Sequence, residues 1–234
     1  MKRTLLAVAA LAGVAVGQAH AGAVGIQLGG PGTGISGFVV LSYGPASDFK
    51  YPGQGFEITS VSGTFTDTNI GIVNAPITSL VPISPTSPLD PLNVQAPKDF
   101  SQFPVAAGLP SENNGFLTYD NLFWPGGAPV TAPDFDGAGG FLDIYGLLFK
   151  IGGTAPVGAV VDLFDNGVSA SGEDLGVSGF GVAVATAGMS LDYVPGDVTA
   201  TVPEPSTWAM MILGFAGVGF AGYSKSRKAA AIAA

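Results

Sequence analysis

The chain of 234 residues contains no cysteine, and its one histidine is His20. The lack of cysteine excludes disulfides, thiolate metal sites and a cysteine nucleophile. The lack of histidine beyond position 20 excludes a Ser-His-Asp triad from the body of the chain, and it removes the other ligand on which most zinc sites depend. Basic residues are also few, 8 against 17 acids, and the net charge of −9 argues against a nucleic-acid partner.

Helix-forming stretches are scarce as well. The chain has 36 glycines and 18 prolines, and both residues break helix interiors, so a mainly helical body is excluded. The hydrophobic fraction of 47% is too high for a disordered chain. A chain of this length and composition is expected to bury one sizeable core in a single domain.

Residues 1–21 have the pattern of a secretory signal peptide. Two basic residues precede the apolar run 4–16, and Ala19 and Ala21 form the small-x-small pattern that signal peptidase accepts. We place cleavage after Ala21, so the mature chain is expected to start at Gly22. The Sec translocon and signal peptidase are the partners that such a segment requires.

Residues 203–234 have the pattern of a second membrane-directed segment. The 16 residues from Trp208 to Tyr223 carry no charge and would span about 24 Å as a helix, slightly less than a typical hydrocarbon core. Aromatic residues mark both ends of this run, as they do at membrane interfaces. The pattern predicts a transmembrane helix over 208–223 with a cytoplasmic basic tail that contains Lys225, Arg227 and Lys228.

The residues just before this helix are Pro203, Glu204 and Pro205. Two prolines around one residue hold the backbone extended and prevent the helix from continuing backwards. The result is a stiff, exposed peptide next to the membrane, in a conformation that a membrane-embedded protease can bind.

This segment closely resembles the PEP-CTERM sorting signal in its Pro-Glu-Pro-x-x-Trp-Ala variant. The matching positions are Pro203, Glu204, Pro205, Trp208, Ala209, Gly214 and Phe215, followed by the basic tail. The resemblance implies a Gram-negative bacterial protein that is exported through the Sec route and recognised by exosortase, a membrane-embedded cysteine transpeptidase. It also implies a transient membrane association, removal of the tail, and delivery of the body to the cell surface or the exopolysaccharide matrix. The alternative is an ordinary membrane anchor with a chance Pro-Glu-Pro.

The body between these ends, residues 22–202, holds three lysines and 16 acids, a formal charge near −13. We expect an acidic surface that repels anionic polymers unless cations bridge them. Runs rich in β-branched and aromatic residues predict strands. They are 35–43, 56–67, 115–124, 141–151, 157–164, 175–186, 191–193 and 197–202.

The predicted fold is an all-β, antiparallel sandwich or jelly-roll-like single domain, with the signal peptide and the transmembrane helix on either side. Strand 157–164 is expected to pair with 141–151 as a hairpin. Residues 76–104 hold seven prolines and are predicted to be a long loop packed on the body.

The body contains four groups of candidate site residues. The acids on or beside predicted strands are candidates for a hydrolase pair, Asp143 and Asp162 first. The full set is Asp134, Asp136, Asp143, Asp162, Asp165, Glu173 and Asp174. The turns 134–137 and 162–167 are candidate Ca²⁺ loops, although Asp-Gly and Asn-Gly are ordinary turn formers.

The aromatic residues Tyr119, Phe123 and Trp124 are a candidate sugar-stacking platform, although core packing is commoner for such residues. The stretch 32–37 fits G-x-G-x-x-G, but strand-forming residues follow it, so we predict a turn and no cofactor. We therefore predict a non-enzymatic exported protein with neither a catalytic nor a metal site. The alternatives are a Ca²⁺-assisted carbohydrate- or matrix-binding module and a secreted carboxylate-based hydrolase.

Overall fold

The computed structural model describes residues 22–48, 50–84, 100–105, 115–132, 137–169 and 179–201. Its strands are β1 (Gly22–Gly29), β2 (Ile35–Ser47), β3 (Phe56–Asp67), β4 (Ile72–Leu80), β5 (Ser101–Pro104), β6 (Phe116–Tyr119), β7 (Leu122–Phe123), β8 (Gly137–Ala138), β9 (Leu147–Ile151), β10 (Val160–Asp165), β11 (Val168–Ser169), β12 (Phe180–Thr186) and β13 (Met189–Thr201). A 3₁₀ turn, η1 (Thr68–Ile70), connects β3 to β4.

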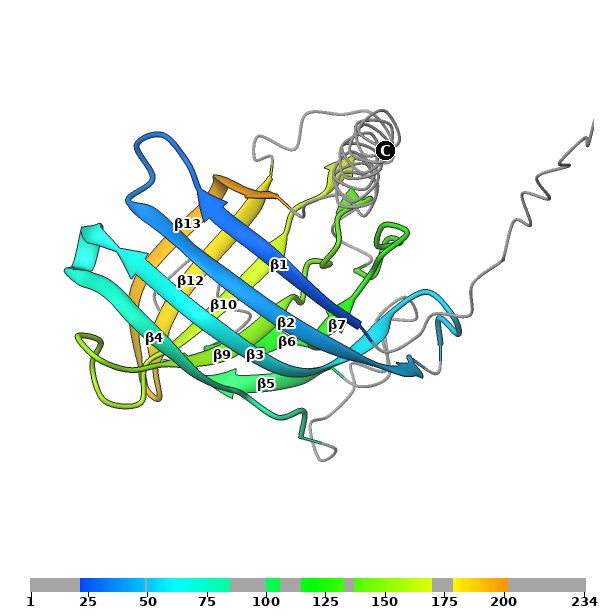
Figure 1. Ribbon diagram of the computed structural model, residues 1–234, viewed down its shortest axis with the longest axis horizontal. Coiled ribbons are helices and arrows are strands. Elements are labelled where there is room, and N and C mark those ends of the chain that lie inside the picture. The colour runs from blue at the N-terminus through cyan, green and yellow to red at the C-terminus, as the bar shows by residue number, and fades with distance from the viewer. Residues whose placement is uncertain are drawn as a thin grey trace, which may run out of the picture.

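Eight of these strands close into an antiparallel barrel (Figure 1). Around the barrel their order is β1, β2, β3, β4, β9, β10, β12 and β13, and β13 pairs with β1 to complete the ring. Each barrel strand therefore lies beside the barrel strands that precede and follow it in the chain, as in an up-and-down barrel. The short strand β7 pairs with the start of β3.

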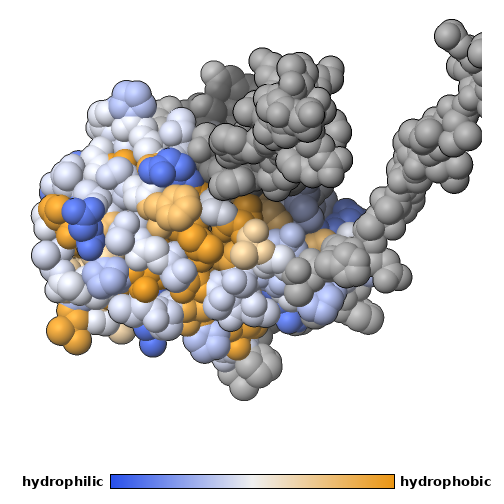
Figure 2. Space-filling view, in the orientation of Figure 1, coloured by the Kyte–Doolittle hydropathy of each residue, from blue (hydrophilic) through white to orange (hydrophobic). Residues whose placement is uncertain are grey.

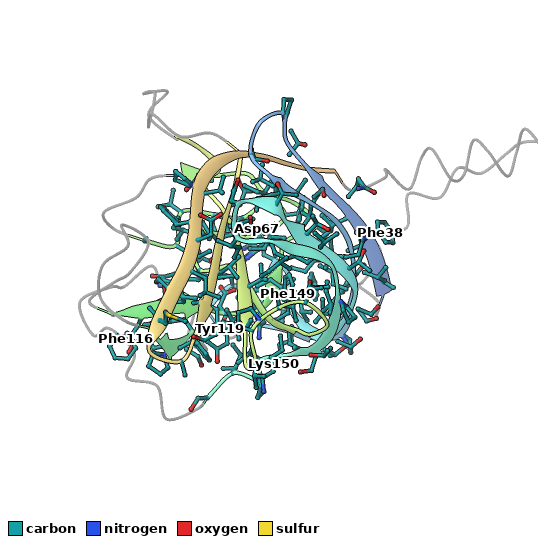
Figure 3. All side chains as sticks on the ribbon, turned by 90° about the vertical axis from the view of Figure 1, so that its left-hand side faces the viewer. Phe38, Asp67, Phe116, Tyr119, Phe149 and Lys150 are labelled. Atoms are coloured by element: carbon teal, nitrogen blue, oxygen red, sulfur yellow. The ribbon has the colours of Figure 1, made fainter. Side chains whose placement is uncertain are left out.

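Apolar side chains fill the barrel interior. On β3, Phe56, Ile58, Val61 and Phe65 are buried, whereas most residues between them are exposed. Phe65 meets Phe149 edge to face, with ring centroids 6.4 Å apart. Figure 3 shows Phe149 inside the ring of strands. Eight strands enclose just enough space for side chains to fill, and the packing of this barrel follows that rule.

Strands β9, β10 and β12 are buried on both faces, because the chain between β4 and β9 packs against their outer side. We call the described residues of 81–146 the β4–β9 segment. The second apolar cluster contains Leu148, Val160, Phe164, Ala183 and Ala185 of the barrel wall and Val81, Val105, Leu117 and Tyr119 of this segment. In Figure 3, Tyr119 and Phe116 lie outside the ring of strands, on the side away from Phe38.

The all-β antiparallel prediction is confirmed, whereas the sheet closes into a barrel instead of forming the expected sandwich or jelly roll. Closure depends on the pairing of Gln27, Leu28 and Gly29 with Thr201, Ala200 and Thr199. Alternation along a strand reports which residues face a core. It does not report whether the first and last strands of a sheet meet, because that pairing joins residues far apart in the chain.

Individual strands agree with the sequence to different degrees. Strand β3 has the predicted bounds, and β9 and β10 form the predicted hairpin, with Lys150 opposite Val160. Residues 191–193 and 197–202 were predicted as two strands, but 189–201 form one strand whose register shifts between Val194 and Val198. Residues 141–146 were predicted as strand and form a loop.

The proline-rich stretch 76–104 is not simply a loop. Strand β4 continues through Pro76 to Leu80, and β5 occupies 101–104. Strand β9 ends at Ile151 opposite Ile77, and the carbonyl of Pro76 accepts a hydrogen bond from Gly152 N just beyond that end. Pro76 therefore lies just beyond the end of the β4–β9 ladder, on the side where its carbonyl points, and its missing N–H costs little there. Residues 85–99 lie outside the described residues.

The described residues contain no helix that is long and apolar enough to cross a membrane. The predicted signal peptide, 1–21, and the predicted transmembrane helix, 208–223, both lie outside the described residues.

Candidate functional site

Aspartates are mostly buried in the described part of the chain. The buried ones are Asp48, Asp67, Asp120, Asp143, Asp162 and Asp165, whereas Glu57 is exposed. Figure 2 shows the face over β1–β4 in pale and orange residues with isolated blue ones. The expected acidic surface does not include these six aspartates, because formal charge counted along a sequence ignores burial.

Asp143 lies at the centre of the buried carboxyls. Its Oδ1 atom accepts hydrogen bonds from the backbone N–H groups of Tyr145 (3.0 Å) and Gly146 (3.1 Å), which close the loop before β9. Its backbone carbonyl accepts from Asp165 N (2.9 Å), which fixes this loop against the end of β10. Burial raises the pKa of Asp143, and the hydrogen bonds from the backbone N–H groups of Gly146 and Tyr145 oppose the rise.

Asp120 faces Asp143 from the turn between β6 and β7. Its Oδ1 atom accepts from Leu122 N (3.0 Å). The Oδ2 atoms of Asp120 and Asp143 are buried and have no hydrogen-bond partner among the described residues. Burial and the neighbouring charge of Asp143 raise the pKa of Asp120 well above its usual range.

Asp162 and Asp165 reach the same group from β10. Burial, followed by the charge of Asp143, raises the pKa of Asp162 well above its ordinary value. Burial also raises the pKa of Asp165 to about 6, although its Oδ1 atom accepts from Gly167 N at 2.7 Å. The structure thus brings together Asp143, Asp162 and Asp165 of the sequence candidates.

Asn121 connects this group to the barrel. Its Nδ2 atom donates to the carbonyl of Val81 (2.7 Å) and its Oδ1 atom accepts from Leu148 N of β9 (2.9 Å). Its backbone N–H donates to the carbonyl of Gly146 (2.9 Å), and its carbonyl accepts from Ile58 N of β3 (2.9 Å). One buried side chain and its backbone therefore join the β4–β9 segment to two strands of the barrel.

A second carboxyl pair lies at the end of β3. Asp67 caps η1 by accepting from Asn69 N at its Oδ1 atom (3.0 Å), while its Oδ2 atom has no hydrogen-bond partner among the described residues. Burial and the charge of Asp192 raise the pKa of Asp67 to about 6. Asn69 Nδ2 donates to Asp192 Oδ2 (2.9 Å), which links η1 to β13.

Sequence reasoning missed Asp48 and Asp120 as members of the central group. The available signal was the dipeptide Asp120-Asn121, which interrupts an otherwise apolar and aromatic stretch from 116 to 124. The candidates Asp134, Asp136, Glu173 and Asp174 lie outside the described residues.

The other candidate groups have clear places in the fold. The aromatic side chains of Tyr119, Phe123 and Trp124 are buried, in agreement with core packing, so they offer no exposed stacking surface. After the turn at Gly32, the stretch 32–37 leads directly into β2, where a dinucleotide site would require a helix. Asp165 and Asn166 are buried, and the described residues bring together no group of three or more acids arranged to hold a metal ion.

The residues of the predicted sorting signal begin where the barrel ends. Strand β13 finishes at Thr201, and only Val202 separates it from Pro203. Strand β1 starts at Gly22, the predicted first residue of the mature chain. The other predicted signal residues lie outside the described residues. They are Glu204, Pro205 and Trp208 of the motif, Gly214, Phe215 and Tyr223 of the anchor, the basic residues Lys225, Arg227 and Lys228, and Ala19 and Ala21 of the signal-peptide cleavage site.

Comparison with known families identifies this C-terminal segment. Residues 201–228 match the family model described as the PEP-CTERM protein-sorting motif. The comparisons found no significant match among curated proteins or among solved structures.

The chain therefore carries a PEP-CTERM sorting motif, as the sequence predicted. The motif indicates an exported protein whose precursor passes through the membrane, and it indicates exosortase as the processing partner.

Proposed function

We propose that this chain is a non-enzymatic exported protein, which exosortase processes at the Pro-Glu-Pro segment and which is retained at the cell surface or in the extracellular matrix. The observation that carries the proposal is the PEP-CTERM motif at residues 201–228. In this proposal the barrel is the cargo, and the residues that matter for sorting are Pro203, Glu204, Pro205 and Trp208.

The position of the last strand supports a removable signal. All described pairings of the barrel involve residues up to Thr201, and Thr201 pairs with Gln27 of β1. Cleavage after Val202 therefore leaves the eight barrel strands and the closing pair intact. A signal that begins after the last strand can be removed without cost to the fold of the cargo.

The burial of the carboxyls supports a structural role for them. A glycoside hydrolase must bring two carboxyl groups to opposite sides of a scissile bond in an accessible site. Asp143 and Asp162 are each 3% exposed, and the Oδ1 atom of Asp143 is occupied by backbone N–H groups. Their environment suits groups that hold two layers together better than groups that meet a polymer.

The test is the intact mass of the exported protein in cells that contain exosortase. We expect a mature species that has lost residues 1–21 and the helix after the Pro-Glu-Pro segment. Glu204→Ala and Pro205→Ala should instead accumulate as a longer, membrane-held precursor, because each removes part of the motif.

Matched variants in the barrel control for effects on folding. Glu57→Ala and Pro156→Ala each alter an exposed residue of the same type in the barrel part of the chain, and both should mature normally. Normal maturation of Glu204→Ala and Pro205→Ala would refute the sorting role of this segment.

A further inference from the structure

The strongest unexplained feature of the molecule is a set of buried carboxyls at one seam. Asp120 and Asp143 belong to the β4–β9 segment, whereas Asp162 lies on β10 of the barrel wall. Among the described residues, the charged groups that act on Asp120 and Asp162 are other carboxyls. An aspartate is rarely buried unless a cation or hydrogen-bond donors compensate its charge, so this arrangement requires a physical cause.

The lack of a compensating partner for a buried carboxyl is clearest at Asp162. Its neighbours Val161 and Leu163 point into the barrel core, so its own side chain points outward to the seam. The side chain is 3% exposed, and its Oδ1 atom has no hydrogen-bond partner among the described residues. An ionised carboxylate in that position would leave a buried charge without compensation, whereas the neutral acid would not.

Asp120 and Asp143 lead to the same conclusion. Their side chains are buried, and their Oδ2 atoms have no hydrogen-bond partner in the described part of the chain, so an ionised carboxylate at either residue would also lack compensation. Their turns lie on the segment that Asn121 joins to Leu148 of β9. Deprotonation of Asp120, Asp143 and Asp162 would place like charges on both sides of the seam, two on the segment and one on β10.

We propose that protons fasten the β4–β9 segment to the barrel wall: Asp120, Asp143 and Asp162 form a neutral clasp in their protonated state, and loss of these protons releases the segment from β9, β10 and β12. Release exposes the outward apolar residues of those strands, including Leu148, Val160 and Phe164. The clasp is a property of the folded barrel and does not depend on the proposed sorting function.

The other titratable groups around the clasp reinforce this behaviour. Asp165 is near Asp143 at the end of β10. From the connection between β2 and β3, Asp48 acts on Asp120, and Tyr51 is near Asp143. Tyr119 faces Asp162 from β6, and its hydroxyl donates to the carbonyl of Pro82 at 2.9 Å. The Nζ atom of Lys50 lies 5.4 Å from the centroid of the Tyr51 ring.

The direction of the pH effect follows from linkage. Burial raises the pKa of Asp120, Asp143 and Asp162 in the closed state, and opening returns them towards their ordinary range near 4. The closed state thus binds these protons more tightly than the open state. Its stabilisation is complete in acid and is lost as the pH rises through the raised pKa values.

Hydrogen exchange of the full chain tests the proposal. The Leu148 amide reports on the seam, because it donates to Asn121 Oδ1, whereas the Val39 amide lies in β2 between β1 and β3 and reports on the barrel alone. After correction for the intrinsic pH dependence of exchange, protection of Leu148 should fall by at least about tenfold between pH 5 and pH 8, because release of one proton on opening changes the equilibrium tenfold per pH unit. Protection of Val39 should change much less.

Two variants separate the clasp from general effects of pH. Asp162→Asn keeps the size of the side chain and cannot ionise, so it should flatten the pH dependence at Leu148. Asp192→Asn alters the other carboxyl pair, at the end of β3, and should leave that dependence unchanged. Leu148 protection that is independent of pH in the wild-type chain, or equal pH dependence in wild type and Asp162→Asn, would overturn the proposal.

Discussion

At the scale of single residues, two asparagines show how the same backbone conformation serves different purposes. Asn74 and Asn121 both adopt positive φ, 48° and 52°, where asparagine is tolerated better than most residues. Asn74 is exposed, whereas Asn121 is buried and uses both ends of its amide in the seam. Only the second residue should matter strongly for stability.

We expect Asn121→Ala to destabilise the protein by about 3 kcal/mol more than Asn74→Ala. Both variants share the penalty of alanine at positive φ, about 1 kcal/mol, but only Asn121→Ala leaves the buried Leu148 N–H and Val81 carbonyl without partners. Urea unfolding of the two variants measures the difference. Equal free energies of unfolding would show that the Asn121 side chain does not hold the seam.

At the scale of strands, β10 shows how tertiary contacts change the meaning of a sequence pattern. Its residues are all buried, because Val161 and Leu163 enter the barrel core while Val160 and Phe164 enter the outer cluster. Strand β2 alternates more clearly, with buried Val39 and Leu41 beside exposed Phe38 and half-buried Val40. The continuous apolar run of β10 therefore indicates a wall covered on both sides.

The covered wall at β10 predicts that a valine-to-threonine substitution lowers stability more at an outward position of β10 than at an outward position of β2. Val160→Thr buries a hydroxyl in the outer cluster and should cost about 2 kcal/mol. Val40→Thr makes the same exchange on a half-buried face and should alter stability by less than about 0.5 kcal/mol. Thermal or urea unfolding distinguishes them, and similar values for both would contradict a covered wall at β10.

At the scale of the whole molecule, the chain divides into a closed barrel and a sorting signal that begins after it. The barrel is closed by residues 199–201 on β1, and the matched motif extends from 201 to 228. In the proposed function, removal of the signal leaves this barrel complete.

A chain of residues 22–202 should consequently fold by itself and unfold in one cooperative transition. A chain of residues 22–198 is the matched control, because it lacks the three residues that pair with β1. The shorter chain should unfold at a markedly lower temperature in calorimetry, since an open sheet leaves β1 and β13 with unpaired edges. Equal melting temperatures would show that closure by β13 contributes little.

The sequence predicts the local strands better than it predicts the buried carboxyls of the seam. Residues 56–67 and the β9–β10 hairpin could be predicted because alternation and turn residues are local. The loop at 141–146 could not, because its residues alternate like a strand while Asp143 and Gly146 bend the chain around a buried carboxyl. Asp120 and Asp162 are 42 positions apart in the numbering, and only the packing of the β4–β9 segment on β10 brings them to one seam.

The sorting motif, the acid-rich and cysteine-free composition, and the tendency to form antiparallel strands were determined by the sequence itself. Each depends on residues close together in the chain, and a protease or a translocon can recognise such a segment before the body folds. The tertiary structure decided that the sheet closes, that one wall is covered, and that six of the described aspartates are buried. Those outcomes depend on contacts between distant residues, where burial sets whether an aspartate carries a charge or a proton.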